Sequence, residues 1–278
     1  MADESPIQKP PMSDDGVVKV EGPAKAQSIL QKKPGSVLKK PRKDFKIDLV
    51  FCVDATSSMK PCIDALKANM KAVVTEKLPG LIETKGGNWN PDLRYRLVGF
   101  RDCEQDEVRQ IEDFGFTSKV DDFVAHVASL EAGGGGDEPE SMLDGIVWAL
   151  SGGGKQETAK LREDAMVAVL AFTDAPSRES VSAMTMKALG LDQLGWTGST
   201  KDVIGLVKSS GARLFLAAPT KGVEVVGNPV AVEMAREPMV FWTETSEKGL
   251  ADVDVAAFLE RVFSSAVKAG TQTKTVLA

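Results

Sequence analysis

Oxygen-bearing side chains follow the first long apolar run of the chain. That run, Ile47–Val53 (IDLVFCV), leads directly into Asp54–Ser58 (DATSS). A carboxylate and two hydroxyls at alternate positions, on a turn that enters a helix, can converge on one point, and such hard oxygens suit Mg²⁺ or a similar cation. The alternative interpretation is that Asp54 only ends a strand and Ser58 only caps the next helix.

Two further segments carry acidic residues at comparable places. The apolar run Met166–Phe172 (MVAVLAF) is followed by Thr173–Pro176 (TDAP), and the tetraglycine at 133–136 leads into Asp137–Glu140 (DEPE) ahead of a helical pattern. Carboxylates gathered in one corner would repel one another strongly unless a cation neutralised them. Together the three segments predict a divalent-metal site.

The elements that must position these residues alternate along the chain. Apolar runs predict strands at 47–53, 93–100, 111–116, 166–172, 213–217 and 240–243. Apolar residues spaced by three and four predict helices at 59–78, 119–130, 142–150, 200–208 and 253–267. Residues 175–199 show no clear pattern, and prolines and glycines mark 219–237 as loop-rich. This alternation predicts a doubly wound α/β domain, with helices on both faces of a mostly parallel sheet.

In such a sheet, ligands bind beyond the carboxyl ends of the strands. Asp54 and Asp174 both follow predicted strands, so we expect them at the same edge. The domain is expected to span residues 45–270. Residues 1–44 are rich in proline and lysine and poor in apolar residues, which predicts a disordered tail, and residues 271–278 are expected to be flexible.

Charge and composition narrow the possible partners. Residues 1–44 carry a net charge of +3 and the remainder −9, which give the overall −6. An acidic body argues against nucleic-acid binding and suits a cation site. The basic segment 32–43 is either a solvated linker or an arm that docks on an acidic surface. No apolar run approaches the ~18 residues of a membrane helix, and the N-terminus is not typical of a signal peptide.

The three cysteines, Cys52, Cys62 and Cys103, follow no metal-ligand spacing, and their odd number cannot pair completely. We therefore expect reduced thiols and a cytoplasmic protein.

The same residues resemble the von Willebrand factor A family and its metal-ion-dependent adhesion site. The likeness covers residues 45–270, and its details are most similar to integrin beta subunits and to the domain attached to some alpha-kinases. Residues 54–60 (DATSSMK) are similar to the D-x-S-x-S-M-K pattern of that group. The segments DEPE and TDA are similar to its D-x-P-E and T-D-A.

The resemblance implies five metal-contacting residues: Asp54, Thr56, Ser58, Glu140 and Asp174. Asp174 would bind Mg²⁺ or Mn²⁺ directly or through water. One coordination position would stay open for the carboxylate of a protein partner. Pro61 and Cys62 replace the two acids of the family's adjacent second site, and Gly135 replaces the asparagine of a third, so the likeness does not extend to those sites.

No catalytic function is expected. The one histidine, His126, falls on a predicted helix and is interpreted as structural, and the glycines at 152–154 do not form a phosphate-binding loop. Two alternatives stay open: a metal-dependent phosphohydrolase with Asp54 as nucleophile, and a structural assembly subunit. The arginines of the second strand and its end, Arg94, Arg96 and Arg101, are interpreted as ordinary charges at the edge of the sheet.

Overall fold

The computed structural model describes residues 43–85, 89–103, 110–136, 138–153, 156–219, 227–245, 257, 259–261 and 264. All of them belong to one compact unit, Pro41–Ala278. Of the tail expected at 1–44, residues 1–42 lie outside the described residues, as does the C-terminus at 271–278. Lys43, the last residue of the basic segment 32–43, and Asp44 are instead the first residues of a strand. Of the closing helix expected at 253–267, only 257, 259–261 and 264 are described, and they are helical.

Six strands form one sheet in the order β3-β2-β1-β4-β5-β6. They are β1 (Lys43–Asp54), β2 (Trp89–Phe100), β3 (Ile111–Thr117), β4 (Ala165–Phe172), β5 (Arg213–Ala218) and β6 (Val240–Glu244). Among these six, β3 runs antiparallel to β2 and the others pair in parallel. The predicted fold class is confirmed, and β1 begins two residues before the expected start of the domain.

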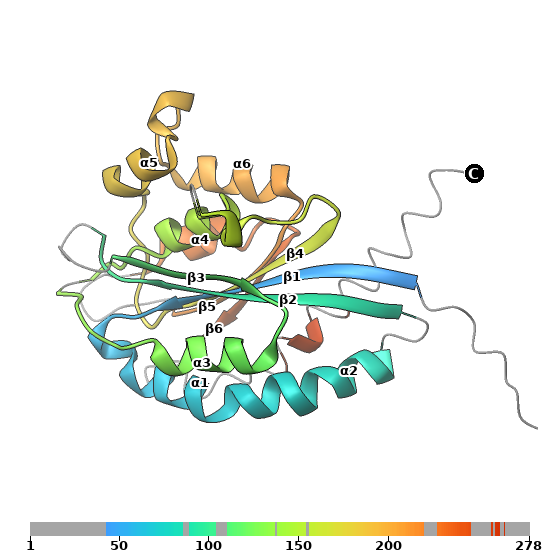
Figure 1. Cartoon of the computed structure of the whole chain (residues 1–278). Helices are drawn as coiled ribbons and strands as arrows, with labels where there is room; N and C mark the ends of the chain where they lie inside the picture. Colours follow the sequence, from blue (N-terminus) through green and yellow to red (C-terminus); the bar gives the residue numbers. More distant parts are fainter. Residues whose placement is uncertain are drawn as a thin grey trace, which may run out of the picture. The chain divides into compact units, whose positions relative to one another are not determined.

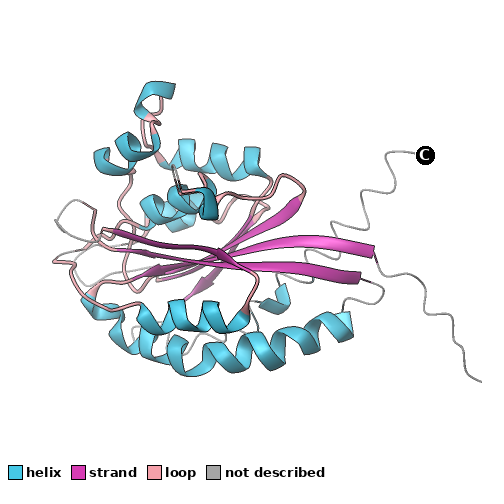
Figure 2. Cartoon of the chain, in the orientation of Figure 1, coloured by secondary structure: helices cyan, strands magenta, loops and turns pink. Residues whose placement is uncertain are grey.

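Helices cover both faces of the sheet (Figure 1). One face carries α1 (Lys60–Ala72), α2 (Leu78–Lys85) and α3 (Val120–Ser129), with a π-helical turn at Val73–Lys77 joining the first two. The other carries α4 (Met142–Leu150), α5 (Ala183–Leu189), α6 (Thr200–Ser210) and α7 (Pro229–Met234). Figure 2 shows the two helical layers on either side of the strands.

Alternation along β1 divides its side chains between two cores. Ile47, Leu49 and Phe51 pack with α1 and α3, whereas Val50 and Cys52 pack with α4 and α6. Because successive residues of a strand point to opposite faces, a continuous apolar run is what a strand covered on both faces needs. The same burial fixes the direction in which the end of β1 presents Asp54.

Two regions without a clear pattern contain short helices. Residues 183–189 form α5, and α7 lies within the segment interpreted as loop. A local signal for α7 was present: Asn228 accepts a hydrogen bond from the backbone N–H of Ala231, and Pro229 occupies the first turn, an arrangement that favours a helix start.

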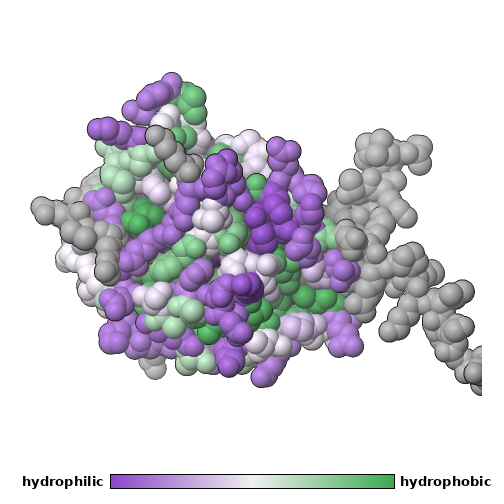
Figure 3. Space-filling model, in the orientation of Figure 1, coloured by the Kyte–Doolittle hydropathy of each residue, from purple (hydrophilic) through white to green (hydrophobic). Residues whose placement is uncertain are grey.

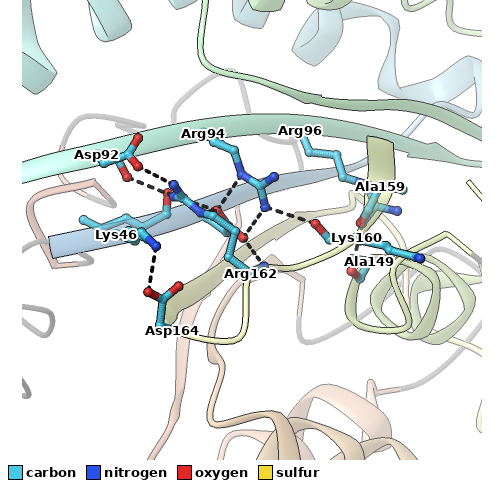
Figure 4. A network of polar contacts seen from close by, with 11 residues as sticks. Lys46, Asp92, Arg94, Arg96, Ala149, Ala159, Lys160, Arg162 and Asp164 are labelled. Atoms are coloured by element: carbon cyan, nitrogen blue, oxygen red, sulfur yellow. Dashed lines mark hydrogen bonds and ion pairs between the residues drawn. The ribbon is translucent and has the colours of Figure 1, made fainter. Parts of the chain in front are cut away.

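The interpretation of the arginines was wrong. Arg96 is fully buried and its guanidinium pairs with Asp113 at 2.6 Å. Arg94 pairs with buried Asp48 at 2.6 Å, and the side chain of Arg101 is 5% exposed. Figure 4 shows Arg94 and Arg96 pointing into a network of polar contacts. The reason is that β2 is an interior strand, with β1 on one side and β3 on the other.

Hydrophilic residues are spread across the face of the molecule drawn in Figure 3. No helix of the described residues is long and apolar enough to cross a membrane. His126 lies on α3 with its ring stacked on that of Phe114, the centroids 5.3 Å apart.

Candidate metal site

Asp54 is the last residue of β1 and is fully buried. Its Oδ1 accepts hydrogen bonds from the backbone N–H of Thr56 at 2.9 Å and from the Thr56 hydroxyl at 2.7 Å. Its Oδ2 accepts from the hydroxyl of Thr173 at 2.8 Å. The turn after β1 therefore folds back on its own carboxylate, as the alternating oxygens predicted.

The oxygens continue from this carboxylate toward the surface. Thr56 Oγ1 and Ser58 Oγ lie 3.3 Å apart, and Ser58 Oγ donates to Asp174 Oδ1 at 3.2 Å. Thr56 is buried, Ser58 is exposed and Asp174 is partly buried. Four of the five predicted ligands thus form a continuous chain of oxygens that opens to solvent at Ser58 and Asp174.

The glycine loop lies directly against the turn after β1. The backbone N–H of Gly133 donates to Ala55 O at 2.9 Å, and that of Ser57 donates to Gly134 O at 3.1 Å. At Gly135 the φ angle is +73°, and a Cβ there would lie 2.9 Å from the Thr56 methyl carbon and 3.3 Å from Glu140 Oε1. A side chain at this position would collide with the site, so the close approach requires glycine.

Glu140 reaches the same corner from the other side of this loop. Its backbone N–H donates to Pro176 O at 2.8 Å, and its carbonyl accepts from the N–H of Arg178 at 2.9 Å. The residue is 5% exposed, and its Oε2 is buried without a hydrogen-bond partner. Asp137, at the start of the same segment, lies outside the described residues.

The electrostatics of the metal-free site are unfavourable. Burial, followed by the charge of Asp174, raises the pKa of Asp54 to about 7. Burial, followed by the charges of Asp54, Asp102 and Asp174, raises the pKa of Glu140 to about 9. Burial also raises the pKa of Asp174, against the opposing hydrogen bond from Ser58. Each carboxylate is thus harder to ionise, first because it is buried and then because other carboxylates lie nearby, and a bound cation would favour the ionised forms.

Within the described residues, no group of three acidic, histidine or cysteine side chains could hold a metal ion by itself. An ion at this corner therefore depends on the hydroxyl oxygens of Thr56 and Ser58 as well as on carboxylates. Hydroxyl and carboxylate oxygens together are a donor set that hard divalent cations accept. Glu140 Oε2 is also suited to bind a cation, because a buried carboxylate oxygen needs a hydrogen-bond donor or a cation and this one has no donor.

Sequence reasoning missed three residues around the site. Thr173 was noted only as part of a motif, yet its hydroxyl holds Asp54. Asp102 and Arg178 form an ion pair at 2.7 Å next to Glu140. A signal existed for Asp102, because it follows the end of β2 as Asp54 ends β1 and Asp174 follows β4.

A comparison of the sequence with models of known protein families agrees with this fold and with the position of the site at this edge of the sheet. The family model of the von Willebrand factor A domain matches residues 48–193, more than half of the chain. The chain belongs to the von Willebrand factor A family.

Similar proteins include the alpha-protein kinase vwkA of Dictyostelium discoideum, 30% identical over 100 residues, which cover 36% of this chain and 15% of that protein. The open conformation of the pilus adhesin SpaC from Lactobacillus rhamnosus GG is similar with a TM-score of 0.48 and 12% identity, over 82% of this chain and 31% of that one. Proximal thread matrix protein 1 from the mussel byssus, with a zinc-occupied MIDAS motif, has a TM-score of 0.47 and 13% identity, over 82% of this chain and 48% of that one. The chain therefore spans less than half the length of each of these proteins.

Proposed function

We propose that this chain is a protein-binding module that holds a carboxylate of its partner through one divalent cation. Asp54, Thr56, Ser58, Glu140 and Asp174 would hold the ion, with Asp174 acting directly or through water. The observation that carries the proposal is the buried Oε2 of Glu140, which has no hydrogen-bond partner and lies in the field of Asp54 and Asp174. Oxygen donors of these kinds favour Mg²⁺ or Mn²⁺ over softer metals.

The exposure of the ligands supports one direction of approach. Asp54 and Thr56 form the buried floor of the site, whereas Ser58 is exposed and Asp174 is partly so. The bound ion would supply a positive charge with a position left for an oxygen ligand. A partner carboxylate would then arrive from the side of Ser58 and Asp174, while the floor residues keep their hydrogen bonds.

We propose no catalytic turnover. Both carboxylate oxygens of Asp54 accept hydrogen bonds, from Thr56 and Thr173, and the residue is fully buried. A nucleophile must reach the atom that it attacks, which argues against the phosphohydrolase alternative. Release of phosphate from p-nitrophenyl phosphate or ATP, abolished by Asp54→Asn, would overturn this part of the proposal.

The metal itself is the first test. Isothermal titration of the chelator-treated protein with MgCl₂ or MnCl₂ is expected to show one site per chain, and Asp54→Asn is expected to weaken binding at that site strongly. Asp64→Asn is a matched control, because Asp64 is an exposed carboxylate on α1 that pairs with Lys60. No binding at millimolar metal by the unsubstituted protein contradicts the proposal.

The partner is the second test. Binding of the partner protein should disappear in EDTA and return when Mg²⁺ is restored. It should be absent in Asp54→Asn but not in Asp64→Asn. Partner binding that ignores EDTA would favour the structural assembly subunit instead. The three cysteines are buried free thiols, and a reducing, cytoplasmic location is part of the proposal.

A further inference from the structure

Asp144, in the first turn of α4, ties the start of that helix to the start of α5. The side chain is fully buried. Its Oδ1 accepts hydrogen bonds from the backbone N–H of Ser182 at 3.0 Å and from the Ser182 hydroxyl. Ser182 in turn caps α5, because its Oγ accepts from the backbone N–H of Thr185. One carboxylate oxygen therefore fixes both the backbone and the side chain of the residue at which α5 begins.

The segment that ends at Ser182 also carries Asp174. Residues 174–182 contain no helix or strand beyond two isolated bridges, so the path of this segment depends on individual contacts. The backbone of Glu140 is bonded to the middle of the segment on both sides of one such bridge. Asp144, four residues after Glu140, holds the end of the segment. Two contacts thus join the segment of Asp174 to the segment of Glu140.

We propose that Asp144 is a positioning residue for the metal site: by holding Ser182 it fixes the path of residues 174–182 and hence the separation of Asp174 from Glu140. The inference rests on the proposed function, in which both carboxylates are ligands of one ion. The same end of the segment is bonded to the loop before α6, where Val181 donates to Gly198 O at 2.8 Å. Without Asp144 the end is free to shift toward that loop and away from α4.

Two competing explanations are that Asp144 attracts the cation by its charge and that it only stabilises the fold. The choice of ion separates position from charge. Mg²⁺ requires nearly ideal octahedral geometry, whereas Ca²⁺ accepts variable numbers and arrangements of oxygen ligands. A displaced ligand therefore weakens Mg²⁺ more than Ca²⁺, whereas the loss of a charge outside the ligand set weakens the two dications alike.

The test is isothermal titration of Mg²⁺ and of Ca²⁺, as chlorides, into chelator-treated full-length variants. Asp144→Ala is expected to weaken Mg²⁺ about tenfold, as the loss of a residue that supports a metal ligand does. Its affinity for Ca²⁺ is expected to stay within about threefold of that of the unsubstituted protein.

Asp144→Asn is the conservative variant, which removes the charge and keeps Oδ1 as an acceptor. The amide nitrogen replaces Oδ2, which has no hydrogen-bond partner within the described part of the chain, so no existing bond is lost. Both ions are expected to bind this variant within about threefold of the unsubstituted protein.

Asn228→Ala is the matched control for lost stability. Asn228 is also a buried side chain that caps a short helix, α7, and none of the predicted ligands lies on its segment. Ser182→Ala keeps the comparison available if Asp144→Ala does not fold, because it removes the hydroxyl contact and leaves the backbone N–H for Asp144. It is expected to weaken Mg²⁺ about threefold and Ca²⁺ less.

Each other outcome overturns the inference. If Asp144→Asn is as weak as Asp144→Ala, or if Asp144→Ala weakens both ions equally, Asp144 acts through its charge. If Asn228→Ala weakens Mg²⁺ as much, the effect is general destabilisation. If Asp144→Ala, or Ser182→Ala in its place, binds Mg²⁺ as well as the unsubstituted protein, this inference fails and the proposed function stands. If the unsubstituted protein binds neither Mg²⁺ nor Mn²⁺, the proposed function itself fails and this inference fails with it.

Discussion

At one end of β1, the buried carboxylate of Asp48 meets two guanidinium groups. Arg94 and Arg162 each donate to it, at 2.6 Å and 2.9 Å, and the network extends from Arg162 to Asp92 (Figure 4). At the other end, six residues or about 20 Å along the strand, Asp54 is equally buried. Its hydrogen-bond donors are Thr56 and Thr173, and the charge of Asp174 raises its pKa further after burial.

The comparison shows at which end of β1 the chain neutralises a buried carboxylate with its own positively charged side chains. A buried carboxylate needs a cation or several donors close by. The chain supplies two arginines at Asp48, whereas around Asp54 it supplies hydroxyls and further acids, and the nearby guanidinium of Arg178 is paired with Asp102. The end at Asp48, the paired end, stabilises the fold on its own. We propose that an external cation completes the end at Asp54, the unpaired end.

The largest effect is expected at the paired end. Asp48→Ala leaves Arg94 and Arg162 facing each other without their shared carboxylate, and we expect a loss of about 3–5 kcal/mol in the free energy of unfolding, measured in urea. Metal affinity should not change, since sites this far apart act independently. A fall in metal affinity at constant stability would contradict the division into two ends.

Asp54→Asn is the matching change at the unpaired end. We expect metal affinity to fall about a hundredfold, or about 2.7 kcal/mol, by titration. In EDTA the variant should be at least as stable as the unsubstituted protein at pH 8, because it removes a charge that burial and Asp174 make unfavourable. A loss of stability as large as that of Asp48→Ala would show that the two ends are alike.

The same contrast explains what could be predicted from the sequence. The strands, the long helices and the corner shared by Asp54 and Asp174 follow from local apolar patterns and from the rule that parallel strands end at one edge. The surroundings of Arg94 and Arg96 do not. Their partners, Asp48 and Asp113, lie on neighbouring strands 46 and 17 residues away, and nothing local shows which strands pair.

The ion pair of Asp102 and Arg178 was missed for a related reason. The two residues are 76 positions apart and meet only because β2 and β4 flank β1. The roles of the five predicted ligands likewise stay predictions that metal titration decides. What the sequence did contain was the requirement for close approach, since the tetraglycine loop packs against the turn after β1.

Stability should depend on pH differently with and without metal. Asp54 and Glu140 have pKa values of about 7 and about 9 in the fold, above the usual 3.8 and 4.5. The metal-free fold therefore holds protons that the unfolded chain has lost, so its stability falls as pH rises from about 4 through 7 toward 9. Metal binding displaces those protons, so affinity should rise at least about tenfold between pH 6 and pH 8.

Thermal unfolding in EDTA and in saturating MgCl₂ measures this directly. The two curves of melting temperature against pH should diverge as pH rises, and the divergence should shrink in Asp54→Asn. Parallel curves would mean that no cation is exchanged for protons at this end.

The smallest expected effect concerns Glu140 and decides its role. Replacement of a carboxylate by an amide of the same shape should weaken the metal about fivefold to tenfold, or about 1.0–1.4 kcal/mol. An ion bound to this variant would be neutralised less completely by its ligands. It would therefore attract a partner carboxylate more strongly. The alternative role, an acid that complements the dipole of α4, is worth about 0.3–1 kcal/mol and affects stability alone.

The structure favours the first role, because α4 begins two residues later and Asp144 is the acid of its first turn. Titration of Glu140→Gln with Mg²⁺, beside the control Asp64→Asn, measures the difference. Unchanged metal affinity in Glu140→Gln, with a small loss of stability, would leave Glu140 as a helix-dipole residue and reduce the ion's charged ligands to Asp54 and Asp174.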